Sequence, residues 1–178
     1  MAMEIAPVTL EGSAVRLEPL SLSHHAELCK IGLDFELWHW TTTNVRTPAE
    51  MRAYIETALA EQARGTSLPF ATIDQASGKV IGSTRYLNID ASNLRVEIGA
   101  TWIAKDWQRT AANTEAKYLM LRHAFRFVRR VVFLVGPENL RSQRAVERIG
   151  AVLVGHSRDG AGRESLVFAI TAAGWIEP

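Results

Sequence analysis

The sequence contains a single cysteine, Cys29. One cysteine excludes a disulfide within the chain and a cysteine-based metal cluster, and it suits a reducing compartment such as the cytoplasm. The first residues carry neither a basic stretch nor a long apolar run, so we expect no signal peptide. No apolar run approaches the length of a membrane span. We therefore expect a cytoplasmic protein that does not bind a membrane.

An excess of charge of one sign is also lacking, because 20 Lys and Arg face 19 Asp and Glu, for a net charge of +1. A nucleic-acid-binding domain is normally more basic, with its charge gathered on one face, so we expect no nucleic-acid partner. The chain has no HExxH pattern, no Walker loop and no GxSxG elbow. His24 and His25 are adjacent and do not share a helix face, and we predict no metal site.

Proline and glycine are scattered at turns and no repeat occurs, so the 178 residues are expected to form one domain. Hydrophobicity and turn signals predict the following elements: strands near 15–17, 69–74, 79–88, 94–103, 131–135, 151–156 and 164–170, and helices near 21–32, 47–64, 113–128 and 139–149. Strands and helices in this order indicate a mixed α+β fold.

Two of these helices have clear local boundaries. Thr47 is a predicted N-cap, Pro48 takes the first helical position, Glu50 completes a capping box and Gly65 ends the helix. The helix after residue 139 ends similarly at Gly150.

The segment 96–114 predicts a strand, a short polar loop and the start of the longest apolar-faced helix. The first main-chain N–H groups of a helix lack partners within the helix, and the helix dipole adds positive charge there. Such a start can bind a phosphate or diphosphate, and Arg109 could add a charge-assisted contact. The alternative is a helix start that is merely capped, as every helix start can be.

Three ordered motifs resemble one protein family. The run from Gln108 to Ala116 is similar to the coenzyme A diphosphate loop of the GNAT acetyltransferase superfamily, and the strand 97–103 resembles the strand that precedes that loop. Residues 139–151 resemble the family's later Asn-x-x-Ser helix and its glycine ending. The opening 15–20 is similar to the RimJ/RimL-like branch, whose members acetylate the N-termini of ribosomal proteins. The resemblance covers most of the chain.

The resemblance implies a GNAT-like acyl-CoA N-acyltransferase fold, with a mostly antiparallel twisted sheet of about six or seven strands and about four helices. It implies an N-acetyltransferase that uses acetyl-CoA as co-substrate and a primary amine, on a peptide N-terminus or a small molecule, as acceptor. A homodimer is also implied, because relatives often dimerise. The cofactor-binding residues that it implies are Trp102, Ile103, Gln108, Arg109, Thr110, Ala111, Ala112, Asn113, Thr114 and Asn139.

Two positions depart from the family pattern. Ala111 stands where glycine is usual, and alanine would be strained there if the position required a positive φ. Val146 stands where many relatives carry a tyrosine that protonates the departing thiolate. That acid is therefore missing from this chain.

Glu97 is the candidate base that deprotonates the amine, and its alternative is a solvated glutamate on the outer face of a strand. Ser142 is the candidate proton donor or water organiser, and its alternative is an ordinary polar residue in a first helical turn. Asn139 would hold the cofactor arm, cap its helix, or do both. The side chain of Trp102 could equally be a core aromatic.

An aromatic-rich irregular segment contains the candidate acceptor-binding residues Trp38, His39 and Trp40. Such a segment requires either a ligand or tight packing, so the alternative is a small core beneath the first two helices. The departures at Ala111 and Val146 leave a second function open, a non-catalytic acyl-CoA sensor or interaction module. A third alternative is a domain that binds no cofactor, which would show no thermal shift with coenzyme A.

Overall fold

The computed structural model describes residues 6–178. Eight strands form one sheet in the order β1-β2-β3-β4-β5-β6-β8-β7, with every neighbouring pair antiparallel except β5 and β6. The strands are β1 Leu10–Glu11, β2 Val15–Pro19, β3 Leu68–Asp74, β4 Val80–Asp90, β5 Arg95–Ile103, β6 Arg130–Val135, β7 Val152–Arg158 and β8 Glu164–Thr171. The predicted mixed fold is confirmed, with one strand more than the upper end of the expected range.

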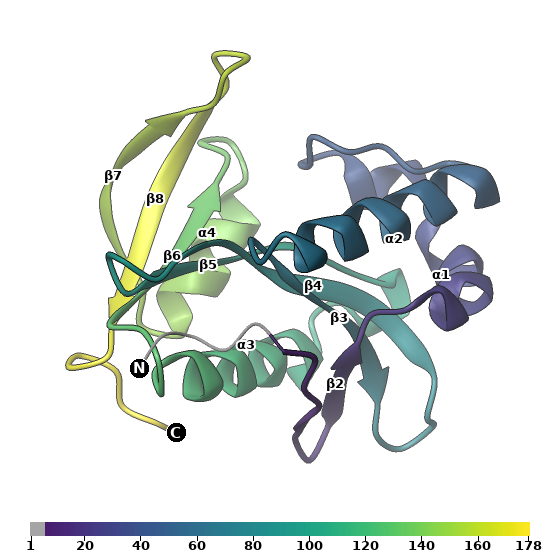
Figure 1. Cartoon of the computed structure of the whole chain (residues 1–178), viewed down its shortest axis with the longest axis horizontal. Coiled ribbons are helices and arrows are strands. Elements are labelled where there is room, and N and C mark those ends of the chain that lie inside the picture. Colours follow the sequence, from purple (N-terminus) through teal and green to yellow (C-terminus); the bar gives the residue numbers. More distant parts are fainter. Residues whose placement is uncertain (1–5) are drawn as a thin grey trace.

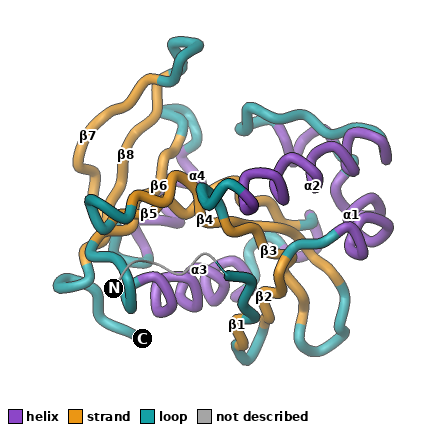
Figure 2. Tube along the Cα trace, viewed as in Figure 1, coloured by secondary structure: helices purple, strands orange, loops and turns teal. Residues whose placement is uncertain are grey.

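Four α-helices and three 3-10 turns complete the described chain. They are η1 Leu22–His24, α1 His25–Gly32, η2 Phe35–Trp38, α2 Pro48–Ala63, η3 Lys105–Trp107, α3 Ala111–Ala124 and α4 Leu140–Arg148. Figure 1 shows α1 and α2 on one side of the sheet and α3 on the other, and Figure 2 shows the same layers by secondary structure. No helix within 6–178 is long and apolar enough to cross a membrane.

Local capping sets the start of α2 as the sequence predicts. Thr47 Oγ1 accepts a hydrogen bond from the Glu50 N–H at 3.1 Å, and Glu50 Oε2 accepts one from the Thr47 N–H at 3.1 Å. This reciprocal pair satisfies two N–H groups that the helix itself leaves unpaired. Gly65 follows the helix with a φ of 77°.

Two hydrophobic cores lie on the two faces of the sheet. The larger core joins the inner faces of α3 and α4 to one face of the strands, and it includes Val96, Ile98 and Val146. The second core joins α1 and α2 to the opposite face and includes Trp38 and Trp102. Side chains alternate along a strand. The side chains of Arg95 and Glu97 therefore point to the face of the sheet opposite that of Val96 and Ile98.

Glu115 on α3 is hydrogen-bonded to the turn between β1 and β2. Its carboxylate accepts hydrogen bonds from the main-chain N–H groups of Ser13 at 3.0 Å, Ala14 at 2.7 Å and Val15 at 2.6 Å. It also accepts one from the Ser13 hydroxyl at 2.7 Å. The N-terminal turn of the chain thereby helps to set the position of α3, whose own start belongs to the candidate site.

Candidate active site

Strands β5 and β6 run side by side over only a short distance. Their parallel pairing is confined to the register from Arg95 opposite Arg130 to Glu97 opposite Val132. From Ile98 to Ile103, the edge of β5 that faces β6 has no strand partner in the described chain. Main-chain N–H and C=O groups require hydrogen-bond partners, so this free edge can bind an extended ligand.

A bulge interrupts the middle of β5. Ser83 lies opposite Trp102 and Arg85 opposite Gly99, so Ala100 and Thr101 together face the single residue Thr84. Ala100 takes a φ of 46°. A bulge of this kind turns main-chain groups out of the ladder, here beside the unpaired edge of β5.

The start of α3 follows β5 after a short loop. Thr110 caps the helix, because its Oγ1 accepts a hydrogen bond from the Ala112 N–H at 3.3 Å. The N–H groups of Ala111 and Asn113 have no acceptor outside the helix among residues 6–178. The Thr110 hydroxyl therefore pairs with only one of the amides at the start of α3. The others stay free, as an anion site requires.

The strain considered at Ala111 is absent. Ala111 is the first residue of α3, and the positive φ of this loop, 61°, belongs to Arg109. The positive φ therefore falls two residues before the position where relatives carry glycine, and an alanine fits the helical conformation at residue 111. Arg109 and Thr110 are both exposed.

Gln108 joins the end of β5 to α4. Its Nε2 donates a hydrogen bond to the Ile103 carbonyl at 3.3 Å, and its Oε1 accepts one from Arg141 at 2.9 Å. The structure thus brings the end of the strand, the loop and α4 together. Arg141 was not among the residues predicted for the site.

Glu97 is buried, with 8% of its surface exposed, which rules out the solvated alternative. Its Oε2 accepts a hydrogen bond from Asn88 Nδ2 at 2.7 Å. Burial raises the pKa of Glu97, and this effect outweighs the opposing influence of the Asn88 hydrogen bond and the charge of Arg95. A carboxyl group with a raised pKa is better matched to accepting a proton near neutral pH.

The start of α4 places Asn139 and Ser142 together. Asn139 is the N-cap, because its Oδ1 accepts a hydrogen bond from the Ser142 N–H at 3.2 Å. Within 6–178, the Ser142 hydroxyl has no hydrogen-bond partner, and the residue is partly exposed. Val146 is buried in the larger core. It brings no polar group to the site.

Trp38 and Trp102 are core residues. Their ring centroids lie 5.4 Å apart, and the Trp38 ring also meets Tyr54 edge-on at 5.2 Å. Trp38 Nε1 donates a hydrogen bond to the Gly32 carbonyl at 2.8 Å. The packing alternative therefore describes both indole side chains, while the main chain of Trp102 remains part of the free strand edge.

A cavity of about 250 Å³ lies beside η2 and the segment that follows it. Trp38 and His39 contribute to its lining, together with threonines 41–43. Trp40 is exposed and meets the His39 ring edge-on at 4.6 Å, but it is not part of the cavity wall. The three predicted acceptor-binding residues are therefore neighbours with different surroundings.

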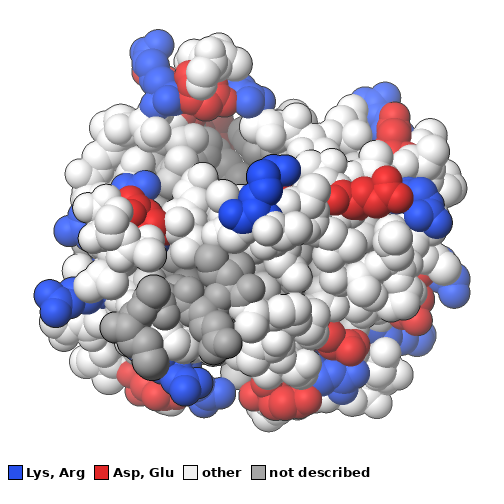
Figure 3. All heavy atoms as spheres, viewed as in Figure 1, with Lys and Arg blue, Asp and Glu red and all other residues white. Residues whose placement is uncertain are grey.

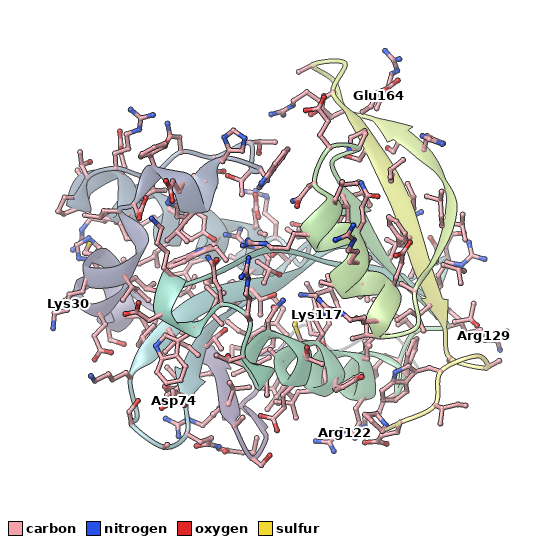
Figure 4. All side chains as sticks on the ribbon, turned by 180° about the vertical axis from the view of Figure 1, so that it is seen from behind. Lys30, Asp74, Lys117, Arg122, Arg129 and Glu164 are labelled. Carbon is pink, nitrogen blue, oxygen red and sulfur yellow. The ribbon has the colours of Figure 1, made fainter. Side chains whose placement is uncertain are left out.

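Sequence reasoning did not single out Asn88 or Lys117. Asn88 has a φ of 47°, a conformation in which asparagine is enriched, but the sequence alone carried no signal of its contact with Glu97. Lys117 is buried on α3, hydrogen-bonded to Asn113 Oδ1 at 3.0 Å, and burial lowers its pKa to about 8. Seen from behind in Figure 4, it rises from α3 toward the centre of the molecule. Lys117 lies three residues before Met120 and seven before Ala124, so it falls on the apolar face of α3, and this spacing is the signal that could have indicated its burial.

Comparisons with known proteins point to one family. The sequence model of a family described as "Acetyltransferase (GNAT) domain" matches residues 14–152. Among curated proteins, no significant match to the sequence was found. A crystal structure of a GCN5-related N-acetyltransferase from Brucella melitensis is 31% identical, with a TM-score of 0.85, and the match covers 96% of this chain and 81% of that chain.

More distant solved structures share the fold. RimJ of Mycobacterium smegmatis, in complex with CoA-disulfide, is 24% identical with a TM-score of 0.76, over 94% of this chain and 87% of that chain. RimL, a ribosomal L7/L12 alpha-N-protein acetyltransferase in complex with coenzyme A, is 18% identical with a TM-score of 0.80, over 92% of this chain and 98% of that chain. At these identities the similarity concerns the fold alone.

Proposed function

Because the chain belongs to the GNAT acetyltransferase family, we propose that it transfers an acetyl group from acetyl-CoA to a primary amine by direct attack. One observation carries the proposal. The unpaired edge of β5 leads to a helix start whose amides of Ala111 and Asn113 are free of protein acceptors in the described chain. An extended arm and a diphosphate at its end match these two features in order along the chain.

The residues present fit such a co-substrate. The free edge of β5 from Ile98 to Ile103 would bind the arm through main-chain hydrogen bonds. The amides at the start of α3 and the exposed Arg109 would bind the diphosphate. When bound, acetyl-CoA supplies the thioester whose acetyl group is transferred. Gln108 would position the loop, because it is hydrogen-bonded to both the Ile103 carbonyl and the Arg141 side chain.

Three groups of this chain would carry the proton and charge movements. The Glu97 carboxylate accepts the proton that the amine loses as its nitrogen forms the new bond to the carbonyl carbon. Main-chain N–H groups at the bulge of β5 stabilise the negative charge that develops on the carbonyl oxygen. As the bond between the carbonyl carbon and sulfur breaks, the departing thiolate takes a proton that the Ser142 hydroxyl, held at the start of α4, relays from a water molecule, which re-protonates the serine.

The acceptor is proposed to be a peptide N-terminus or a small amine. An α-amine has a pKa of about 7.7–8.0, so its deprotonation requires only a modest base such as Glu97. The cavity beside Trp38 and His39 is the proposed approach for the acceptor, with Trp40 at its exposed side. A homodimer and a cytoplasmic location stay predictions of the sequence.

The buried Val146 favours a second candidate, a sensor that binds acyl-CoA without transferring the acyl group. An apolar side chain in the core cannot protonate a thiolate, so this function would follow if Ser142 does not supply the proton. Binding and turnover must therefore be measured separately.

The test measures coenzyme A affinity by calorimetry and thiol release from acetyl-CoA with a panel of peptides and small amines. In Glu97→Gln, thiol release should fall by about 10²–10⁴-fold, as expected for a lost general base, while affinity for coenzyme A stays unchanged. Glu56→Gln is the matched control, because Glu56 is an exposed carboxylate on α2 that pairs with Arg52. Tight cofactor binding without turnover on any acceptor would support the sensor instead.

A further inference from the structure

A second polar cavity lies at the opposite end of β5 from the loop that precedes α3. Its volume is about 780 Å³, and three arginines, Arg95, Arg129 and Arg130, contribute to its wall together with Thr171. We call this cavity the arginine pocket. Ala172 and Ala173 add apolar surface. Figure 4 shows Arg129 at the outer edge of the molecule, beside the end of β8.

The register of the sheet places two of these cations directly opposite each other. Arg95 on β5 pairs with Arg130 on β6, and Arg130 pairs in turn with Thr171 on β8. Residues directly opposite in neighbouring strands point to the same face, and like charges in this arrangement destabilise a sheet. A bound anion would remove that repulsion.

No carboxylate within the described part of the chain pairs with these three arginines. Among residues 6–178, neither Arg95, Arg129 nor Arg130 forms an ion pair. Arg95 favours the ionisation of two carboxylates, Asp90 and Glu97, and both are engaged by other groups. The side chain and N–H of Asn93 and the hydroxyl of Ser92 donate to Asp90, and these hydrogen bonds lower its pKa to about 2.

The nearby Glu97 is likewise engaged, because its Oε2 accepts a hydrogen bond from Asn88. Each guanidinium presents several N–H donors in a planar fork that fits a phosphate. All three arginines are exposed, and among residues 6–178 their side chains form no hydrogen bond, so their donors are open to a ligand from outside the chain.

We propose that the arginine pocket binds a small phosphate-bearing molecule. Three guanidinium groups suit a dianion, which a phosphate monoester becomes near neutral pH. The cavity volume falls within the range of about 300–1,000 Å³ that is typical of small-molecule sites, so an organic body attached to the phosphate fits, with the two alanines as its apolar contact.

This site is separate from the proposed diphosphate loop. Arg95 begins β5 and the loop follows its end at Ile103, which at about 3.3 Å per residue puts the two roughly 26 Å apart along the strand. A long nucleic acid is disfavoured as the ligand, because positive and negative side chains are interspersed on the face shown in Figure 3 and the net charge is only +1.

The test titrates the whole chain with phenyl phosphate and with inorganic pyrophosphate in a calorimeter. The double variant Arg95→Gln/Arg130→Gln should bind phenyl phosphate at least tenfold more weakly than the unaltered chain. Arg52→Gln is the control, because Arg52 is an exposed arginine on α2 that pairs with Glu56 outside both phosphate sites, and it should leave phenyl phosphate affinity unchanged. Failure of coenzyme A binding would overturn the proposed function while leaving this result intact.

The double variant should unfold at the same or a higher urea concentration than the unaltered chain without ligand, because the repulsion between the two cations is gone. If it does not fold, Arg95→Lys/Arg130→Lys keeps the charges but removes the planar forks, and its phenyl phosphate affinity should fall at least threefold. Equal affinity in all variants would overturn the proposal. So would a single-stranded RNA dodecamer that binds more tightly than phenyl phosphate at this site.

Discussion

Replacing Glu115 by alanine should destabilise the protein by about 3 kcal/mol. The carboxylate accepts four hydrogen bonds from the turn between β1 and β2, two of them from the partly buried N–H groups of Ala14 and Val15. A hydrogen bond to a charged group contributes about 1.5–3 kcal/mol. Because water can replace the acceptor at the exposed Ser13, we count only the two partly buried bonds and take the lower value for each.

The assay is urea unfolding of Glu115→Ala and the unaltered chain at pH 7, with circular dichroism as the signal. The midpoint should fall while the slope of free energy against urea stays the same. Glu115→Gln is the matched control, because it keeps an oxygen acceptor without the charge and should lose less. Gly12→Ala is an independent test, since a Cβ there would lie 2.7 Å from the Glu115 carboxyl carbon and displace it.

The effect should also depend on pH. Burial alone raises the pKa of Glu115, but the hydrogen bonds from Ser13, Val15 and Ala14 outweigh it and lower the pKa below its usual value of 4.5. A carboxyl group with a lowered pKa in the folded state stabilises that state above its unfolded pKa and ceases to do so as pH falls through the folded pKa. The stability difference between Glu115→Ala and the unaltered chain should therefore shrink below about pH 4.5. A loss of less than about 1 kcal/mol at pH 7, or a difference that persists at low pH, would refute this reasoning.

Three further changes have defined outcomes. In Asn88→Ala, loss of the hydrogen bond that lowers the pKa of Glu97 should move the acidic limb of the kcat/KM profile to higher pH, and an unmoved limb would exclude Glu97 as the base. Tyr86→Phe removes a hydrogen bond of 2.6 Å from the buried Tyr86 hydroxyl to the Met120 carbonyl and should cost about 0.5–1.5 kcal/mol in urea unfolding, because that carbonyl keeps its partner within α3; no loss would show that the bond is dispensable. Lys117→Met should be neutral or stabilising in urea at pH 7, because the burial that lowers the pKa of Lys117 to about 8 penalises its charged form. Unaltered protein should gain stability relative to this variant as pH rises from 8 to 10.5, since the folded state then no longer holds the buried proton, and a constant difference would contradict this.

Several elements could be predicted because local chemistry determines them. The capping box at Thr47 and the closing hairpin formed by β7 and β8 are where the sequence predicts them. The long helix was expected over 113–128 but occupies Ala111–Ala124, because Thr110 caps it early and the apolar pattern continues past its end into a turn. The helix expected from residue 21 begins as the 3-10 turn η1, where His24 Nδ1 accepts a hydrogen bond from the Ser21 N–H.

Elements that depend on distant partners were missed or placed inexactly. Strand β1 has two residues and exists through its pairing with β2, so no periodicity of its own could reveal it. The burial of Trp38 likewise follows from its contacts with Tyr54 and Trp102, which come from other parts of the chain.

By itself, the sequence determined the capped starts of α2 and α4, most of the strand pattern and the loop that precedes α3, because these follow from side chains close together along the chain. Only the tertiary structure decided that Glu97 is buried against Asn88, that β5 and β6 part after a short pairing, and that Arg95 lies opposite Arg130. Those features depend on the register between strands and on which face of the sheet each helix covers. Register and layer packing arise from contacts between distant segments, and the alternation of residues within one strand does not contain that information.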